Sequence, residues 1–161
     1  QNATNLKIKR VNSKYLNVLL ADDDIDDCNF FKKALEELQL FTDLKIVHDG
    51  EELMKYLDAN SSNLPDILFL DLSMPRKTGF ECLTEIKEDE KLKTLPVTVF
   101  TTSFSRGPDF EQHIAKLLNR IGAEDYIRKP GDFEQLKQII SRVIKMVKIN
   151  KTSKSEDSVF E

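Results

Sequence analysis

The stretch Ile67-Leu68-Phe69-Leu70-Asp71-Leu72-Ser73-Met74-Pro75 decides the expected fold of this chain. Its first four residues are apolar, and the run lies between Pro65 and Pro75, which is typical of a short strand buried on both faces. Such a strand needs helices on each side, which indicates a parallel α/β sheet. Ligands of these sheets bind beyond the carboxyl ends of the strands, where Asp71 stands. Because any aspartate can simply end a strand, its meaning depends on a second acidic cluster.

That second cluster follows another apolar run. Residues 16–21 lead into Asp22-Asp23-Asp24-Ile25-Asp26-Asp27, in which five carboxylates repel one another unless a cation or a helix N-terminus compensates. The last three carboxylates fall where a helix begins, and we expect them to cap its free amides and complement its dipole. Asp22 and Asp23 come too early for capping, and we predict that they hold a divalent cation.

The rest of the chain alternates strand-like runs with segments of helical periodicity. Five strand-then-helix units predict a doubly wound α/β fold, a five-stranded parallel sheet with helices on both faces. The predicted strands are residues 16–21, 44–47, 67–70, 97–100 and 125–128, and the predicted helices are residues 26–40, 51–57, 79–89, 110–121 and 133–147. The expected buried faces include Phe30, Phe31, Ala34, Leu35 and Leu38 of the first helix, and Ile114, Leu117, Leu118 and Ile121 of the fourth.

Length and composition set further limits. The 161 residues suit one domain, residues 16–147, preceded by residues 1–15 and followed by a polar, solvated tail at residues 148–161. The first segment is an arm, a remnant of expression or a short edge strand. A net charge of -4 argues against nucleic acid as a partner, and no apolar run approaches the roughly 18 residues of a membrane span. We therefore expect a soluble, cytoplasmic protein without nucleic-acid or membrane binding.

Single cysteines and histidines add little chemistry. Cys28 and Cys82 have no metal or redox spacing, and the predicted helices place them on opposite faces of the sheet. We therefore expect reduced thiols rather than a disulfide. His48 closes the second strand without a second ligand nearby, which favours a surface or packing role.

The strand ends bring together Asp22, Asp23, Asp71, Thr101 and Lys129. Carboxylates that face one another are costly without a cation, and hard oxygen ligands in a partly open site suit Mg²⁺. A lysine and a threonine hydroxyl add a positive charge and a donor, which matches the needs of phosphoryl transfer. A carboxylate can itself be the nucleophile and become an acyl phosphate.

These residues carry a resemblance to a known family. Over roughly residues 16–147 the chain resembles the receiver domain of response regulators in two-component signalling, of the single-domain, CheY-like type. The resemblance rests on four motifs in order: Leu19 to Asp24, the Asp-x-x-Met-Pro-x-x-x-Gly run from Asp71 to Gly79, Pro96 to Thr102, and Tyr126 to Pro130. It implies a flavodoxin-like sheet with strand order 2-1-3-4-5.

The resemblance also implies a role for each site residue. Asp71 would be the phospho-acceptor of a His-Asp phosphorelay, supplied by a sensor histidine kinase or a phosphotransfer protein. Asp22 and Asp23, with Asp71 and the backbone carbonyl of Ser73, would hold Mg²⁺. The only chemistry would be self-catalysed acceptance and hydrolysis of the phosphoryl group, so the chain would not be an enzyme in the usual sense.

Further implied roles concern the output. Thr101 would sense the phosphoryl group, which would offer it an acceptor that it lacks at rest. Lys129 would pair with the phosphoryl group, and the Lys129–Pro130 peptide bond would fall where the family commonly has a cis bond. Tyr126 would be the switch aromatic, and the face of the fourth helix, fifth strand and fifth helix would be read by a protein target. A packing role for Tyr126, without movement, is the alternative.

Two departures and two other functions stay open. Thr102 stands where the family usually has a very small residue, and its bulk could slow entry of a donor or of water. The segment from Thr101 to Lys129 is also longer than usual. A Mg²⁺-dependent phosphatase with an aspartyl-phosphate would carry a second aspartate two residues after the nucleophile, where Ser73 stands. A binding module that is never phosphorylated would have lost key residues, and none is missing.

Overall fold

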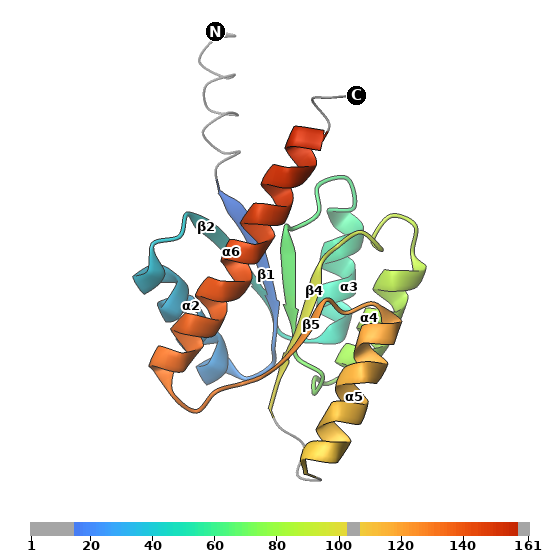
Figure 1. Ribbon diagram of the computed structural model, residues 1–161. Coiled ribbons are helices and arrows are strands. Elements are labelled where there is room, and N and C mark those ends of the chain that lie inside the picture. The colour runs from blue at the N-terminus through green and yellow to red at the C-terminus, as the bar shows by residue number, and fades with distance from the viewer. Residues whose placement is uncertain (1–14, 103–106, 158–161) are drawn as a thin grey trace, which may run out of the picture.

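The chain folds into three layers, with one parallel sheet between two layers of helices (Figure 1). This computed structural model describes residues 15–102 and 107–157. Helices α2 (Ile25–Leu38) and α6 (Phe133–Asp157) cover one face of the sheet, and helices α3 (Gly50–Ala59), α4 (Gly79–Glu88) and α5 (Pro108–Ile121) cover the other. The residue ranges 1–14 and 158–161 lie outside the described residues, and with them all of the expected arm except Tyr15.

The sheet has five parallel strands in the order β2-β1-β3-β4-β5, as predicted. The strands are β1 (Leu16–Ala21), β2 (Thr42–Val47), β3 (Ile67–Leu70), β4 (Val97–Thr101) and β5 (Asp125–Arg128). The central strand β3 is buried along its whole length, which confirms its two-sided burial. The doubly wound architecture agrees with the alternation of strand-like runs and helical segments, and the flavodoxin-like strand order agrees with what the resemblance implied.

Alternating side chains of β3 pack into two separate hydrophobic cores, one on each face of the sheet. Phe69 packs edge-on against Phe31 of α2, with ring centroids 4.9 Å apart, and lies in the core beneath α2 and α6. Leu68 and Leu70 point to the opposite core, beneath α3, α4 and α5. Burying each large apolar side chain stabilises the fold by about 1.5–3 kcal/mol. Cys28 lies in the first core and Cys82 in the second, and both are free thiols, so the two do not form a disulfide.

Local sequence sets where the helices begin. The side chain of Asp24 accepts a hydrogen bond from the backbone N–H of Asp27 at 3.0 Å, which confirms the predicted N-cap of α2. Thr78 and Glu81 form a capping box at the start of α4. Gly79 follows, and a Cβ there would lie 2.2 Å from the carbonyl oxygen of Asp71. Only glycine allows α4 to begin this close to the end of β3.

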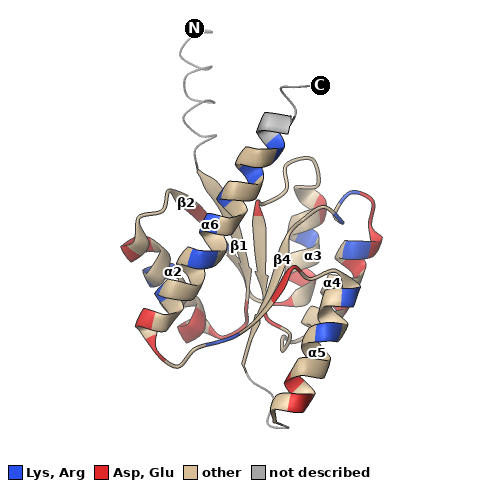
Figure 2. Cartoon of the chain, in the orientation of Figure 1, with Lys and Arg blue, Asp and Glu red and all other residues tan. Residues whose placement is uncertain are grey.

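Helix α6 is ten residues longer than predicted. We expected it to end at Val147 and a solvated tail to follow, but the helix runs to Asp157. No proline or glycine interrupts residues 148–157, and side chains tie this part of the helix to the domain. The ammonium of Lys151 lies 3.1 Å from a carboxylate oxygen of Asp66, and Lys148 donates to the carbonyl of Leu40. Basic residues recur along α6 (Figure 2).

The predicted buried faces of α2 and α5 each included a residue that is exposed. Phe30 is 54% exposed, because the buried stripe of α2 runs through the neighbouring Phe31 and successive helical residues point about 100° apart. In α5 only Leu118 is fully buried, and Leu117 is 42% exposed.

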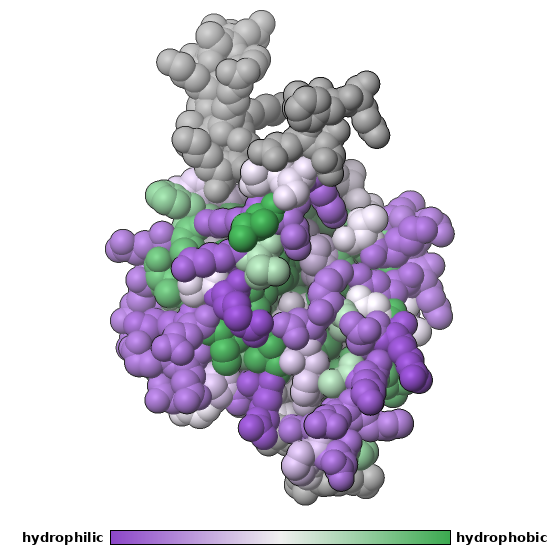
Figure 3. All heavy atoms as spheres, viewed as in Figure 1, coloured by the Kyte–Doolittle hydropathy of each residue, from purple (hydrophilic) through white to green (hydrophobic). Residues whose placement is uncertain are grey.

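The surface formed by α2 and α6 is mostly hydrophilic with a few apolar areas (Figure 3). Within the described ranges, no helix is both long and apolar enough to cross a membrane.

Candidate functional site

The register of two neighbouring strands brings the key carboxylates together. Strands β1 and β3 pair Ala21 with Leu70, so the next residues, Asp22 and Asp71, lie level with each other beyond the strand ends. The backbone N–H of Asp71 donates to the carbonyl of Ala21 at 3.0 Å. Asp22 is 1% exposed and Asp71 is 5% exposed. Two buried carboxylates therefore face one another at the sheet edge where the sequence predicted a site.

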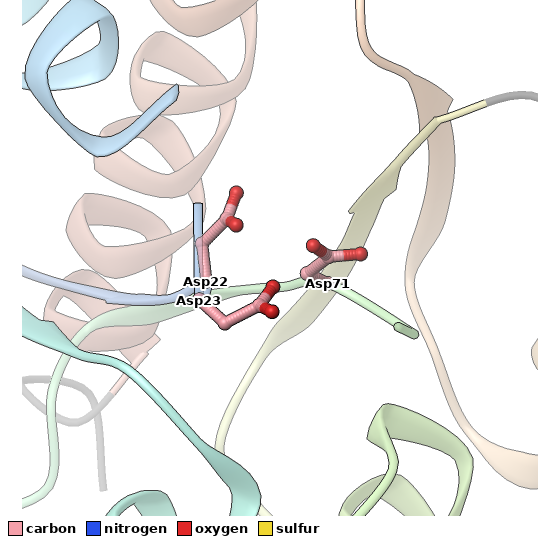
Figure 4. A group of neighbouring side chains, drawn as sticks. All are labelled: Asp22, Asp23 and Asp71. Carbon is pink, nitrogen blue, oxygen red and sulfur yellow. The ribbon is translucent and has the colours of Figure 1, made fainter. Parts of the chain in front are cut away.

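Asp23 completes a cluster of three carboxylates (Figure 4). One oxygen from each of Asp22, Asp23 and Asp71 lies within 4.8 Å of the others, while Asp23 itself is exposed. Oδ2 of Asp22 is buried and pairs with the Lys129 ammonium at 2.6 Å without regular hydrogen-bond geometry. Three converging carboxylates, one of them exposed, fit a hard divalent cation that keeps several waters.

Burial has an electrostatic cost for Asp22. Loss of hydration raises the pKa of Asp22 from 3.8 to about 6, even though Lys129 and the backbone N–H of Asp24 favour the ionised form. Asp24 N donates to Asp22 Oδ1 at 3.0 Å. The ring Nδ1 of His48, an exposed residue as expected, lies 3.2 Å from the backbone carbonyl of Asp22.

Lys129 supplies the positive charge of the site. Its Nζ lies 2.6 Å from Asp22 Oδ2, 2.8 Å from Asp27 Oδ2 and 3.3 Å from Asp71 Oδ2. Burial alone would lower the pKa of this ammonium, but the contacts with Asp22 and Asp27 outweigh burial and raise it. The lysine is therefore a permanent cation. Its own backbone N–H donates to the carbonyl of Thr101 at 2.7 Å, which positions it beside the end of β4.

Thr101 is already engaged with Asp71. Its buried hydroxyl Oγ1 donates to Asp71 Oδ1 at 2.8 Å, and the backbone N–H of Ser73 donates to the same oxygen at 3.1 Å. The expectation that Thr101 lacks an acceptor without a phosphoryl group was therefore wrong. The close approach of β3 and β4 gives the hydroxyl a carboxylate partner before any chemistry takes place.

The Lys129–Pro130 peptide bond also differs from what the resemblance implied. It is trans, as are all described peptide bonds. Trans is the intrinsically preferred form of such bonds by about 0.5–1 kcal/mol.

Tyr126 lies beside α5, half-buried against the core of that face. Its buried hydroxyl interacts with the Glu111 carboxylate, although neither the hydroxyl nor Glu111 Oε1 makes a hydrogen bond of regular geometry within the described residues. Burial, together with the neighbouring Glu111 carboxylate, raises the pKa of Tyr126. The other oxygen of Glu111 lies 3.6 Å from Arg128.

Thr102 is exposed next to the site, and residues 103–106 of the longer segment lie outside the described ranges.

Asp27 is the site residue that sequence reasoning missed. Its position suggested only a role at the start of a helix, and Asp24 is the residue that caps α2. The carboxylate of Asp27 instead binds Lys129, which is 102 residues away in the sequence. The one available signal in the sequence was that two further acidic residues, Asp26 and Asp27, follow the capping Asp24.

The fold therefore places a cluster of carboxylates beyond the carboxyl ends of the strands of a doubly wound sheet. A sequence model of the response regulator receiver domain matches residues 18–141. The chain belongs to this family, the receiver domains of two-component signalling.

Among curated proteins, the probable methanogenesis regulatory protein FilR2 of Methanothrix harundinacea (strain 6Ac) is 30% identical over 129 residues, which cover 78% of this chain and 79% of FilR2. The chain spans about half the length of several other curated relatives that it matches.

Solved structures agree with this assignment. The phosphorylated cyanobacterial phytochrome response regulator RcpA matches with a TM-score of 0.69 and 33% identity, over 80% of this chain and 91% of that one. The Mn²⁺-bound form of response regulator Rcp1 matches with a TM-score of 0.68 and 26% identity, over 80% and 91% of the two chains. In the family, such domains are signalling modules that interact with histidine kinases or phosphotransfer proteins and bind a divalent metal.

Proposed function

We propose that this chain is a phosphorylatable receiver of a cytoplasmic phosphorelay, with Asp71 as the phospho-acceptor. The observation that carries the proposal is the surroundings of the Asp71 carboxylate. Thr101 and Ser73 donate to one of its oxygens, Lys129 contacts the other, and two further carboxylates face it. This arrangement supplies a nucleophile, fixed donors and a cation-binding face in one place.

In the proposed reaction, an Asp71 oxygen attacks phosphorus of a phosphohistidine on a sensor kinase or phosphotransfer protein. The P–O bond forms as the P–N bond breaks, and the electron pair of that bond stays on the imidazole nitrogen. Lys129 offsets negative charge on the phosphoryl oxygens, and Thr101 can turn its hydroxyl toward one of them. Asp71 needs no separate base because a carboxylate is a nucleophile in its ionised form.

Mg²⁺ is the cation we propose for the cluster. Asp22, Asp23 and Asp71, with the carbonyl of Ser73, would hold it, and it would neutralise charge on the transferring group. The convergence of the three carboxylates and the exposed position of Asp23 support this, as does the metal in the related Rcp1 structure.

Output would pass from Thr101 to Tyr126 and the surface formed by α5, β5 and α6, the face expected to be read by a downstream protein. The half-buried position of Tyr126 against the core beneath α5 supports this route, since its strand β5 pairs with β4, the strand that ends at Thr101. Amide chemical shifts with and without beryllofluoride test this. Changes at residues 114–127 are expected, and changes confined to the ends of β1 and β3 would contradict the switch.

Mass spectrometry after incubation with acetyl phosphate and Mg²⁺ tests the acceptor. We expect one added phosphoryl group on the wild-type protein and none on the Asp71→Asn variant, with a melting curve to show that the variant is folded. The Asp66→Asn variant is a matched control, since Asp66 lies just before β3, away from the cluster, and should be labelled normally. Undiminished labelling of Asp71→Asn would overturn the assignment.

A further inference from the structure

The hydrogen bonds of the Lys129 ammonium include one to a carboxylate outside the metal-binding cluster. Nζ donates to Asp27 Oδ2 at 2.8 Å and to Asp71 Oδ2 at 3.3 Å, so the bond to Asp27 is the shorter of the two. Asp22 Oδ2 is nearer still, at 2.6 Å, in an ion pair with Nζ. Three carboxylates therefore share the ammonium, and of these only Asp27 lies outside the cluster.

Asp27 is not itself placed to bind the cation. The described carboxylates whose oxygens converge are those of Asp22, Asp23 and Asp71. Asp27 lies in the first turn of α2, and its side chain is 35% exposed. A cation on the cluster would engage Asp22 and Asp71, two of the three carboxylates around Lys129. Asp27 is the partner that Lys129 would keep.

We propose that Asp27 is a positioning residue for Lys129, an inference that rests on the proposed function. It gives the ammonium a carboxylate partner on the α2 side that remains when a cation engages Asp22, and it keeps Nζ within reach of Asp71. Because Nζ already contacts Asp22 Oδ2, a cation at that oxygen has to displace the ammonium. Without Asp27, Lys129 would have no carboxylate outside the cluster to retain, and it would compete more strongly with the cation for Asp22 Oδ2.

Two simpler roles for Asp27 make different predictions. A capping role is already filled, because Asp24 caps α2 and the backbone N–H of Asp27 donates to it. A general contribution of negative charge would be shared by Asp26, the preceding residue of the same turn, which is exposed. Asp26→Asn is therefore a matched control that removes the same charge without touching Lys129.

The test is the Mg²⁺ affinity of the unphosphorylated chain, measured by titration calorimetry. Asp27→Asn is expected to weaken binding about tenfold beyond the effect of Asp26→Asn, the usual scale for losing a residue that orients a ligand group. In a Lys129→Met background the competitor is gone, so the two asparagine variants should then behave alike. Asp27→Glu keeps a carboxylate within reach of Lys129 and should retain wild-type affinity, and melting curves report folding.

The possible outcomes distinguish a failure of the positioning role of Asp27 from a failure of the proposed function. Wild-type protein that binds no Mg²⁺ would contradict the proposed metal site. Wild-type binding together with equal affinities of Asp27→Asn and Asp26→Asn would overturn the positioning role, as would a difference that persists without Lys129. Acetyl phosphate labelling adds a second readout, because a high Mg²⁺ concentration should restore the labelling rate of Asp27→Asn if competition is the cause.

Discussion

Thr101 and Asp71 are joined across neighbouring strands by a hydrogen bond of 2.8 Å from Oγ1 to Oδ1. Both side chains are buried, so the bond is shielded from water. A phosphoryl group on Asp71 would have to draw this hydroxyl from the carboxylate to a phosphoryl oxygen. The proposed switch is therefore an exchange of acceptors over a short distance, and the free energy involved is the difference between two hydrogen bonds to charged groups.

Replacing Thr101 by valine should separate phosphorylation from output. The Thr101→Val variant keeps the side-chain shape but loses the donor, which should lower the free energy of unfolding by about 1–2 kcal/mol. We expect Asp71 still to be labelled, while the chemical-shift response of Tyr126 to beryllofluoride disappears. Thr98→Val is the control, because Thr98 is another buried threonine of β4 and lies at the other end of the strand. A full response in Thr101→Val would contradict the switch.

The raised pKa of Asp22 predicts a pH dependence of stability without metal. The folded protein releases this proton near pH 6, and the unfolded chain near 3.8. Between these values the folded state holds the extra proton, so lowering the pH from about 7 to about 4 relieves the cost of the buried charge. Asp22→Asn should therefore be more stable than wild type by about 1–3 kcal/mol near neutral pH, and the gap should close near pH 4.

Urea unfolding in a chelating buffer at several pH values measures this gap. The same proton competes with the cation, so Mg²⁺ affinity of the wild-type protein should fall as the pH drops below about 6. A gap that stays constant with pH would show that Asp22 titrates normally.

Thr102 is predicted to slow access to the site. It is exposed directly after β4, beside the buried hydroxyl of Thr101. Thr102→Ala should raise the rates of labelling and of hydrolysis by about two- to tenfold, equivalent to a barrier change of about 0.4–1.4 kcal/mol. Stopped-flow labelling with a small phosphodonor and decay of the phosphorylated form measure both rates. Unchanged rates would mean that the threonine does not obstruct the site.

The extension of α6 should be dispensable for the fold. A chain that ends at Val147 loses the hydrogen bond of Lys148 to the Leu40 carbonyl, which contributes about 0.5–1.5 kcal/mol. It also loses the contact of Lys151 with Asp66, in which the lysine side chain is 52% exposed, and such exposed pairs contribute about 0–1 kcal/mol. We expect the truncated chain to melt cooperatively, with less helical signal in circular dichroism, and to be labelled on Asp71 at the wild-type rate. Loss of cooperative melting would show instead that residues 148–157 belong to the domain.

The strands and the positions of the strand-end residues were predictable from sequence alone. Residues 67–70 are apolar without interruption, and such a run has few stable locations other than the centre of a parallel sheet. Because parallel strands end at one edge, placing Asp22, Asp71, Thr101 and Lys129 required only the order of the strands. The cap at Asp24, which depends on a local signal, was also predicted correctly.

Only the tertiary structure decided which partner each polar side chain has. Asp27 and Lys129 lie 102 residues apart, and nothing local distinguishes a capping aspartate from one that holds a distant lysine. The hydroxyl of Thr101 meets Asp71 because β3 and β4 are neighbours, and α6 continues past Val147 because distant residues accept its lysines. Periodicity reports which face of an element is buried, whereas hydrogen-bond partners depend on how separate elements come together, and a single sequence carries little direct record of that.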